Sequence, residues 1–322
     1  MRWKACFYLN DDQNEISNRD TKWPFGLQSK KCPPQVNELK AFEEDLIRMT
    51  ENIQYRKVNN SFLSSLRSDA AKINASDKVY VFADKTRNLY KLDKASYEKL
   101  LNENITAKYK RAKDDTMDVI TNDLFKIADK LDVSDRIDTM TVKQAFITLK
   151  DHKDSFAAKP SCKLINPAKN EMGKVSKVIL DTINTKIRSI SKVNQWRNTM
   201  SVIDWFRHIP DKDRCTFVVF DIVDFYPPIS SNLLLTALPW AKTFTNITRQ
   251  ESDAIMHARQ SLLFNNDKLW AKRNSSSNFD VTMGSYDGAE VCELIGLYIL
   301  TNLEKRLNQG SIGLYRDDGL AV

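Results

Sequence analysis

The sequence predicts an α+β fold in which an antiparallel sheet is flanked by helices. An Asp-Gly step lies between two apolar runs within residues 313–322, and this is the strongest short signal for a β-hairpin. Residues 216–226 form a β-branched and aromatic run without proline, which predicts a buried strand. Residues 39–53 and 175–193 carry apolar side chains at helical spacing, which predicts two of the helices.

Composition bounds the class of protein. The chain has 322 residues, 42% of them hydrophobic, which is enough for two subdomains and a sizeable core. Its 49 Lys and Arg exceed its 42 Asp and Glu, and the net charge of +7 is compatible with a phosphate-bearing partner. Five scattered cysteines without CxxC spacing indicate neither a disulfide framework nor a zinc site, and favour a reducing intracellular compartment. No apolar run is long enough to span a bilayer, so we expect no membrane partner.

The first 75 residues are predicted to form an extension that contains one helix. Residues 1–35 are polar and carry Trp23-Pro24 and Pro33-Pro34, which predicts little independent structure. We expect the helix over residues 39–53 to pack on a core rather than to bind a partner. Its 3-4-3-4 apolar spacing is amphipathic and consists of Leu39, Phe42, Leu46, Met49 and Ile53.

Short strands and longer helices are predicted from residue 78 to residue 193. Strands are expected at 78–85, which ends in Asp84 and Lys85, at 145–150, and at 162–165, where Lys163 points away from Leu164. Helices are expected from residue 97, around 117–131, and at 175–193. Basic side chains lie in the loops on either side of the third strand and on one face of the last helix. Either a solvated surface or contact with a nucleic-acid backbone explains them: Lys153, Lys159, Lys169, Lys174, Lys177, Lys186, Arg188 and Lys192.

The last third of the chain contains the strongest motifs. Pro227-Pro228 breaks the strand 216–226, and Ser230 or Ser231 caps a helix that continues to Ala241. Another helix is predicted at 249–264, a hairpin at 264–270, and a buried helix at 291–307. Between them lies Met283-Gly284-Ser285-Tyr286-Asp287-Gly288-Ala289-Glu290, whose glycines either admit a close backbone approach or only begin the helix.

Three carboxylates are the candidate catalytic groups. Asp317 and Asp318 should lie on or beside the turn of the hairpin, and Asp221 at the carboxyl end of the buried strand. Adjacent carboxylates resist ionising together, and a divalent cation with hard oxygen ligands removes that conflict. A solvated surface turn for the pair, and a helix or loop cap for Asp221, are the alternatives.

These motifs, in this order, resemble the palm of a reverse transcriptase. Phe220-Asp221-Ile222-Val223-Asp224-Phe225-Tyr226 and Tyr315-Arg316-Asp317-Asp318 match that family's first and third palm motifs, and the Gly-rich turn matches the second. The resemblance covers roughly residues 78–322. It implies a right-hand polymerase with fingers at 76–210 and a palm at 211–322, partly interleaved, after an N-terminal extension at 1–75. Met283-Gly284-Ser285 and Ala83-Asp84-Lys85 are similar to Penelope-like elements, whereas Ala289-Glu290 departs from the Ser-Pro of many relatives.

The resemblance also implies roles for single residues. Asp221, Asp317 and Asp318, with the backbone carbonyl of Ile222, would hold two Mg²⁺ ions, with Mn²⁺ as the alternative metal. Tyr226 would act as the steric gate against ribonucleotides, and Lys163 would contact the triphosphate. Further substrate-binding residues would be Lys85, Lys169, Phe225 and Gly284.

The function expected from this resemblance is RNA-directed DNA synthesis by a retroelement enzyme, Penelope-like or of another non-LTR type. The partners would be an RNA template, a DNA primer and deoxynucleoside triphosphates. An RNA-directed RNA polymerase is one alternative, against which Tyr226 argues, and a non-catalytic nucleic-acid-binding module derived from a polymerase is another. The chain stops at Val322 within the returning strand, so we expect the thumb to be absent from it and the chain itself to be weakly active or inactive.

Overall fold

The computed structural model describes most of the chain. It covers Arg2, Ala5, Leu9 and residues 24–33, 35–54, 61–223, 225–273, 275, 278–282, 284–307 and 310–322. Most of the predicted extension at 1–35 lies outside these residues, as do Asp224 and Met283. No helix in the described ranges is both long and apolar enough to cross a membrane.

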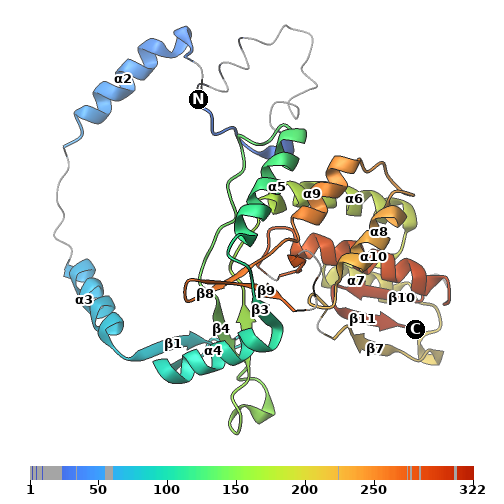
Figure 1. The fold of residues 1–322 in the computed structure, drawn as a ribbon. Coiled ribbons are helices and arrows are strands. Elements are labelled where there is room, and N and C mark those ends of the chain that lie inside the picture. Colours follow the sequence, from blue (N-terminus) through green and yellow to red (C-terminus); the bar gives the residue numbers. More distant parts are fainter. Residues whose placement is uncertain are drawn as a thin grey trace.

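Helices and small, mainly antiparallel sheets make up the described structure, which is an α+β fold (Figure 1). The sheet nearest the C-terminus has the order β6-β10-β11-β7, in which only β10 and β6 run parallel. Its strands are β6 (Asn194–Gln195), β7 (Val218–Asp221), β10 (Ile312–Tyr315) and β11 (Asp318–Ala321).

Three smaller sheets lie on the other side of the molecule in Figure 1. Two are hairpins, β1-β2 and β4-β5, which an isolated bridge from Ala83 to Leu149 joins. In the third, β3 pairs with β9, so the segment predicted as fingers contributes a strand to one predicted as palm. The strands are β1 (Lys78–Phe82), β2 (Leu89–Asp93), β3 (Tyr109–Arg111), β4 (Phe146–Leu149), β5 (Cys162–Ile165), β8 (Leu263–Asn265) and β9 (Lys268–Lys272).

Helices bury the inner face of the C-terminal sheet. The 20-residue helix α6 buries a stripe at helical spacing that includes Val175, Ile179, Ile183 and Ile187, and it packs against α9 and α10. Side-chain caps begin three of the helices, through Asn198, Ser230 and Thr248. The helices here are α5 (Thr116–Lys130), α6 (Met172–Ser191), α7 (Thr199–Arg207), α8 (Ser231–Ala241), α9 (Arg249–His257) and α10 (Gly288–Glu304), and α4 (Lys94–Lys108) packs on the smaller sheets.

The predicted N-terminal helix forms, but it does not pack on the core. Helix α2 (Lys40–Glu51) and the following α3 (Ser61–Ala75) contain no buried residue and project away from the body of the molecule (Figure 1). The expectation of a core-packing helix is therefore wrong. Apolar periodicity predicts a helix with one apolar face, but it carries no information on what covers that face.

Two further predictions need correction. The strand that ends in Asp221 is not buried, because among the described residues β7 is the edge of its sheet and pairs with β11 alone; Val219 is 80% exposed. The helix predicted over 249–264 ends at His257, and residues 263–265 form strand β8 instead. An apolar run of that length does not by itself distinguish the end of a buried helix from a buried strand.

Candidate active site

The predicted C-terminal hairpin is present, but its turn lies two residues earlier than the Asp-Gly step. Tyr315 and Asp318 close the hairpin, and Arg316 and Asp317 form the turn, with Arg316 at φ 58°. Gly319 therefore lies within β11, where a Cβ atom would meet the Phe220 ring at 2.1 Å. Close approach of that ring, rather than turn geometry, requires the glycine at this position.

The sheet register brings the candidate acids to one end of two strands. Asp318 lies directly opposite Asp221 in the antiparallel β11–β7 pair, so their side chains leave the same face. The backbone amide of Ile222 donates to the Asp317 carbonyl at 2.8 Å, which fixes the turn against the end of β7. Asp221 and Asp318 are exposed and Asp317 is partly buried. Within the described ranges, which omit Asp224, no three His, Cys, Asp or Glu side chains are grouped closely enough to hold a metal ion.

The two aromatic residues after β7 have different surroundings. Phe225 is buried in the main core, whereas Tyr226 is half-buried beside the acids. Burial raises the pKa of Tyr226; the adjacent Cys292 thiol and the Asp317 charge add to this, and Arg316 opposes it. Burial likewise raises the pKa of the Cys292 thiol, to about 12. Tyr226 therefore stays a neutral phenol between the hairpin turn and helix α10.

The predicted basic contacts lie elsewhere. The Lys163 ammonium on β5 forms an ion pair with Asp84 at 3.1 Å, just after β1, and Lys85 beside it is exposed. The Lys169 ammonium lies 4.7 Å from the centre of the Tyr286 ring. In the described part of the chain, no hydrogen bond or ion pair joins these lysines to the three acids. Arg188, predicted on the basic face of α6, is paired with Glu293.

The glycine-rich loop before α10 is tightly packed. A Cβ atom on Gly284 would approach the Asn166 carbonyl at 3.0 Å, and one on Gly288 would approach Ser285 Oγ at 2.7 Å. Both glycines are therefore required for packing within the protein, beyond any helix-start role.

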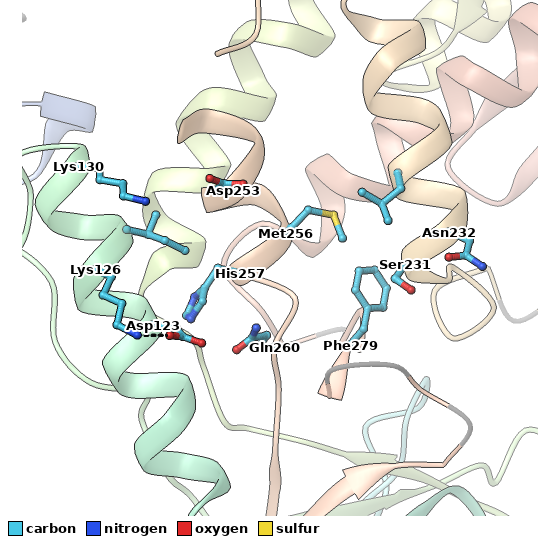
Figure 2. A pocket seen from close by; sticks show the side chains of 12 residues that line it. Asp123, Lys126, Lys130, Ser231, Asn232, Asp253, Met256, His257, Gln260 and Phe279 are labelled. Atoms are coloured by element: carbon cyan, nitrogen blue, oxygen red, sulfur yellow. Dashed lines mark hydrogen bonds and ion pairs between the residues drawn. The ribbon is translucent and has the colours of Figure 1, made fainter. Parts of the chain in front are cut away.

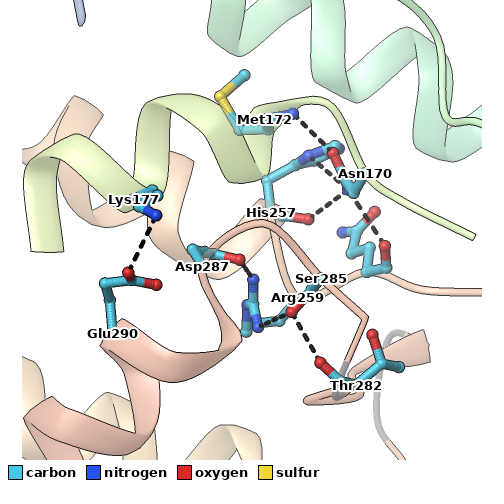
Figure 3. Close-up of polar contacts among 10 residues, drawn as sticks. Asn170, Met172, Lys177, His257, Arg259, Thr282, Ser285, Asp287 and Glu290 are labelled. Atoms are coloured by element: carbon cyan, nitrogen blue, oxygen red, sulfur yellow. Dashed lines mark hydrogen bonds and ion pairs between the residues drawn. The ribbon is translucent and has the colours of Figure 1, made fainter. Parts of the chain in front are cut away.

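Arg259 holds this loop from within the core, and it was not predicted from the sequence. Arg259 is fully buried and is paired with the buried Asp287, and it reaches Ser285 Oγ at 3.5 Å (Figure 3). The available signal was a lone arginine within the mostly apolar stretch 254–264, which is costly to bury without an anionic partner.

Two pockets lie outside the group of predicted site residues. One, of about 510 Å³, is an open pocket between α5, α8 and α9, and its lining includes Lys126, Lys130, Asp253, His257 and Phe279 (Figure 2). The other, of about 480 Å³, is lined by residues 227–232, which directly follow Tyr226, together with Lys272, Arg273, Ser275 and Phe279. None of the predicted site residues lines either cavity.

Comparison with known proteins adds little to this geometry. No protein-family model and no curated protein matches the chain. Among solved structures, apo telomerase from Candida tropicalis is similar with a TM-score of 0.47 and 9% sequence identity, over 88% of this chain. The chain spans 56% of that telomerase chain. At this TM-score and identity the likeness supports no conclusion about function.

Proposed function

We propose that this chain carries out template-directed nucleotidyl transfer, as the fingers and palm of a retroelement reverse transcriptase, Penelope-like or of another non-LTR type. The observation that supports the proposal is the strand register, which sets Asp221 opposite Asp318 and ties Asp317 to the backbone after Asp221. Residues 76–210 would form the fingers and 211–322 the palm, with β3 and β6 shared between them.

The donor set suits a hard divalent cation. Carboxylate and carbonyl oxygens are the ligands that Mg²⁺ prefers, and Asp221, Asp317, Asp318 and the Ile222 carbonyl supply only oxygen. When bound, two such ions would activate the primer 3′-hydroxyl and neutralise the charge of the departing pyrophosphate. The β11–β7 pairing keeps the strands that carry Asp221 and Asp318 in register, although among the described residues the three carboxylates are not grouped closely enough to hold an ion by themselves.

Other residues would bind and orient the substrates. Tyr226 would exclude the ribose 2′-hydroxyl, because its ring is held between the turn and α10. Lys163 and Lys85 would contact the triphosphate, with Asp84 restraining the Lys163 ammonium. Gly284 would let the backbone approach the base pair, Lys169 would contact a phosphate, and Phe225 would support Tyr226 from the core.

Primer extension tests the proposal. The chain would be incubated with an RNA template, a DNA primer, deoxynucleoside triphosphates and Mg²⁺ or Mn²⁺, beside the Asp317→Asn variant. Asp267→Asn is the matched control, because Asp267 lies in the exposed turn of the β8–β9 hairpin, away from the acids. The chain itself should extend the primer only weakly; this extension should be lost in Asp317→Asn and kept in the control.

The outcomes also separate the alternative functions. Equal extension by both variants would reject the metal assignment, and extension only with ribonucleotides would indicate an RNA polymerase. Nucleic-acid binding without extension by any form would favour the non-catalytic module.

A further inference from the structure

The buried Arg259 contacts the loop of residues 284–287, which leads into α10. The side chains of Arg259 and Asp287 are both 0% exposed and form an ion pair. Arg259 also reaches Ser285 Oγ, which in turn donates to the Thr282 carbonyl at 2.9 Å. One guanidinium therefore contacts two of the four residues 284–287 (Figure 3).

The backbone around Arg259 pairs with residues 278–280, which precede this loop in the sequence. The Asp280 amide donates to the Arg259 carbonyl at 2.8 Å, and the Ser261 amide donates to the Asn278 carbonyl at 3.0 Å. Gln260 and Phe279 form an antiparallel bridge between these bonds. The backbone of Arg259 thus holds Asp280, which precedes the loop, and its side chain holds Ser285 and Asp287 within the loop.

Two asparagines fix the segment that carries Arg259. The Asn170 amide donates to the carbonyls of His257 at 2.9 Å and Gln260 at 3.1 Å (Figure 3). The Asn166 amide donates to the Leu262 carbonyl at 3.2 Å, and the Asn166 carbonyl is the group that Gly284 faces. The loop is therefore held between the 166–170 segment on one side and Arg259 on the other.

We propose that Arg259 is a positioning residue, whose contacts with Asp287 and Ser285 hold residues 284–287 in the conformation that meets the templated base pair. The role given to the loop rests on the proposed function, whereas the contacts of Arg259 with the loop do not depend on it. A planar guanidinium suits the task, because it directs several N–H donors in fixed directions toward different partners.

The charge state of the pair is compatible with this role. Burial lowers the pKa of Arg259 to about 10, and nearby acidic groups oppose the shift, so the guanidinium stays charged at neutral pH. Arg259 Nε and Asp287 Oδ2 have no hydrogen-bond partner within the described residues. A slight rotation would let these two atoms pair with each other and make the contact bidentate.

Experiments can separate the effect of the Arg259–Asp287 pair on the stability of the protein from its effect on the position of the loop. Replacing a buried ion pair with apolar side chains often leaves stability unchanged or higher, whereas removing one partner leaves an uncompensated buried charge. The single variants Arg259→Met and Asp287→Asn should therefore unfold more easily. The double variant Arg259→Met/Asp287→Leu should recover thermal stability, yet it lacks the contact with Ser285.

Amide hydrogen exchange of the free protein is the first measurement, and it needs no activity. In the double variant, the amides of residues 284–287 should exchange about tenfold faster or more, while those of α6 stay protected. Lys177→Met is the matched control, since it breaks the ion pair between the half-exposed Lys177 on α6 and Glu290 on α10 and should leave the loop unchanged. Wild-type protection of the loop in a stably folded double variant would overturn the proposal.

The nucleotide KM is the second measurement. The double variant should raise the KM for the templated nucleotide about tenfold and change kcat much less, because the loop positions the base pair rather than the reacting atoms. An unchanged KM in a variant with a loosened loop would overturn the assigned role. If wild type extends no primer, the proposed function fails, while the exchange experiment still decides whether Arg259 holds the loop.

Discussion

Under the proposed function, Tyr226 is the residue whose ring excludes the ribose 2′-hydroxyl. A Cβ atom on Gly288 would come within 3.8 Å of its ring, and the Asp317 and Arg316 charges act on its hydroxyl. The ring is therefore held by packing against α10, with its hydroxyl beside the Cys292 thiol.

Tyr226→Ala should increase ribonucleotide incorporation relative to deoxyribonucleotide incorporation, because the ring beside the sugar is removed. The ratio of the two kcat/KM values is the measurement. Tyr226→Phe serves as the control, since it keeps the ring and removes only the hydroxyl beside Cys292, and its ratio should match wild type. An equal ratio in all three proteins would reduce Tyr226 to a packing residue.

At Gly319, the close approach of a neighbouring ring limits which residue the protein can accept. A Cβ atom there would lie 2.1 Å from the Phe220 ring on the neighbouring strand, which is a steric overlap. Gly319→Ala should lower the free energy of unfolding by about 1–3 kcal/mol, as overpacking does, although alanine normally suits a strand better than glycine.

Urea denaturation would measure this decrease. The double variant Gly319→Ala/Phe220→Leu should recover part of the stability, because the smaller side chain leaves room for the methyl group. Unchanged stability in the single variant would mean that Phe220 does not lie over Gly319.

At the scale of elements, the hairpins β1-β2 and β4-β5 bring Lys163 beside Asp84, and under the proposed function this lysine contacts the triphosphate. Lys163 lies on β5 opposite Thr148, and Asp84, just after β1, pairs with its ammonium. The ion pair thus joins the two hairpins and directs the lysine.

Lys163→Ala should raise the KM for nucleoside triphosphates by about 10- to 100-fold, as expected when one charge-assisted hydrogen bond to a phosphate is removed. Steady-state kinetics at fixed primer–template measures it. Lys91→Ala, an exposed lysine on β2, is the matched control. If both variants keep the wild-type KM, Lys163 is a structural partner of Asp84 and no more.

Helix α9 ends in the buried His257, whose protonation should make the free energy of unfolding depend on pH. The His257 ring donates from Nε2 to the Ile120 carbonyl at 3.0 Å. Burial lowers the pKa of His257 below its ordinary 6.5, and the Ile120 hydrogen bond and the Asp123 charge oppose the shift. The unfolded chain therefore takes up a proton at a pH where the folded chain does not.

Stability should consequently fall as pH drops below 6.5, until the pH reaches the lower pKa of the folded state. The decrease is at most about 1.4 kcal/mol for each pH unit, because one proton is involved. Urea midpoints between pH 7.5 and pH 5.5 measure it. His257→Gln should flatten this dependence and His208→Gln, at an exposed site, should not; the reverse result would assign the effect to another group.

At the scale of the molecule, basic side chains gather where the two hairpins meet. Asp151 accepts hydrogen bonds from Thr86 at 2.6 Å, Asn88 at 2.8 Å and Tyr90 at 3.1 Å, which ties the β1–β2 turn to the loop after β4. The neighbouring basic residues form what we call the hairpin-tip cluster, namely Lys85, Arg87, Lys150 and Lys153.

Single-stranded RNA should bind the chain with an affinity that falls as salt rises. Changing the hairpin-tip cluster to glutamine should weaken binding and reduce the slope of log K against log salt by about 0.7 for each phosphate that is no longer neutralised. Lys40, Arg48, Arg67 and Lys72, on the projecting helices α2 and α3, form the matched control set of equal charge. Equal effects of both sets would show that net charge alone, and no particular surface, attracts the RNA.

Local patterns in the sequence determined most of the elements. The helices near 117–131, 175–193 and 291–307, the Ser230 cap and the C-terminal hairpin follow from apolar periodicity, capping and turn residues, all of which act between near neighbours. The placing of Asp221 and Asp318 at strand ends followed from the same signals.

Only the tertiary structure decided what lies beside each element. It left α2 uncovered and made β7 an exposed edge. It placed the hairpin turn at Arg316-Asp317, two residues before the Asp-Gly step, and placed the Phe220 ring over Gly319. It also paired Arg259 with Asp287 and Lys163 with Asp84, across 28 and 79 residues. These outcomes depend on contacts between distant segments, whose burial and charge compensation no local pattern contains.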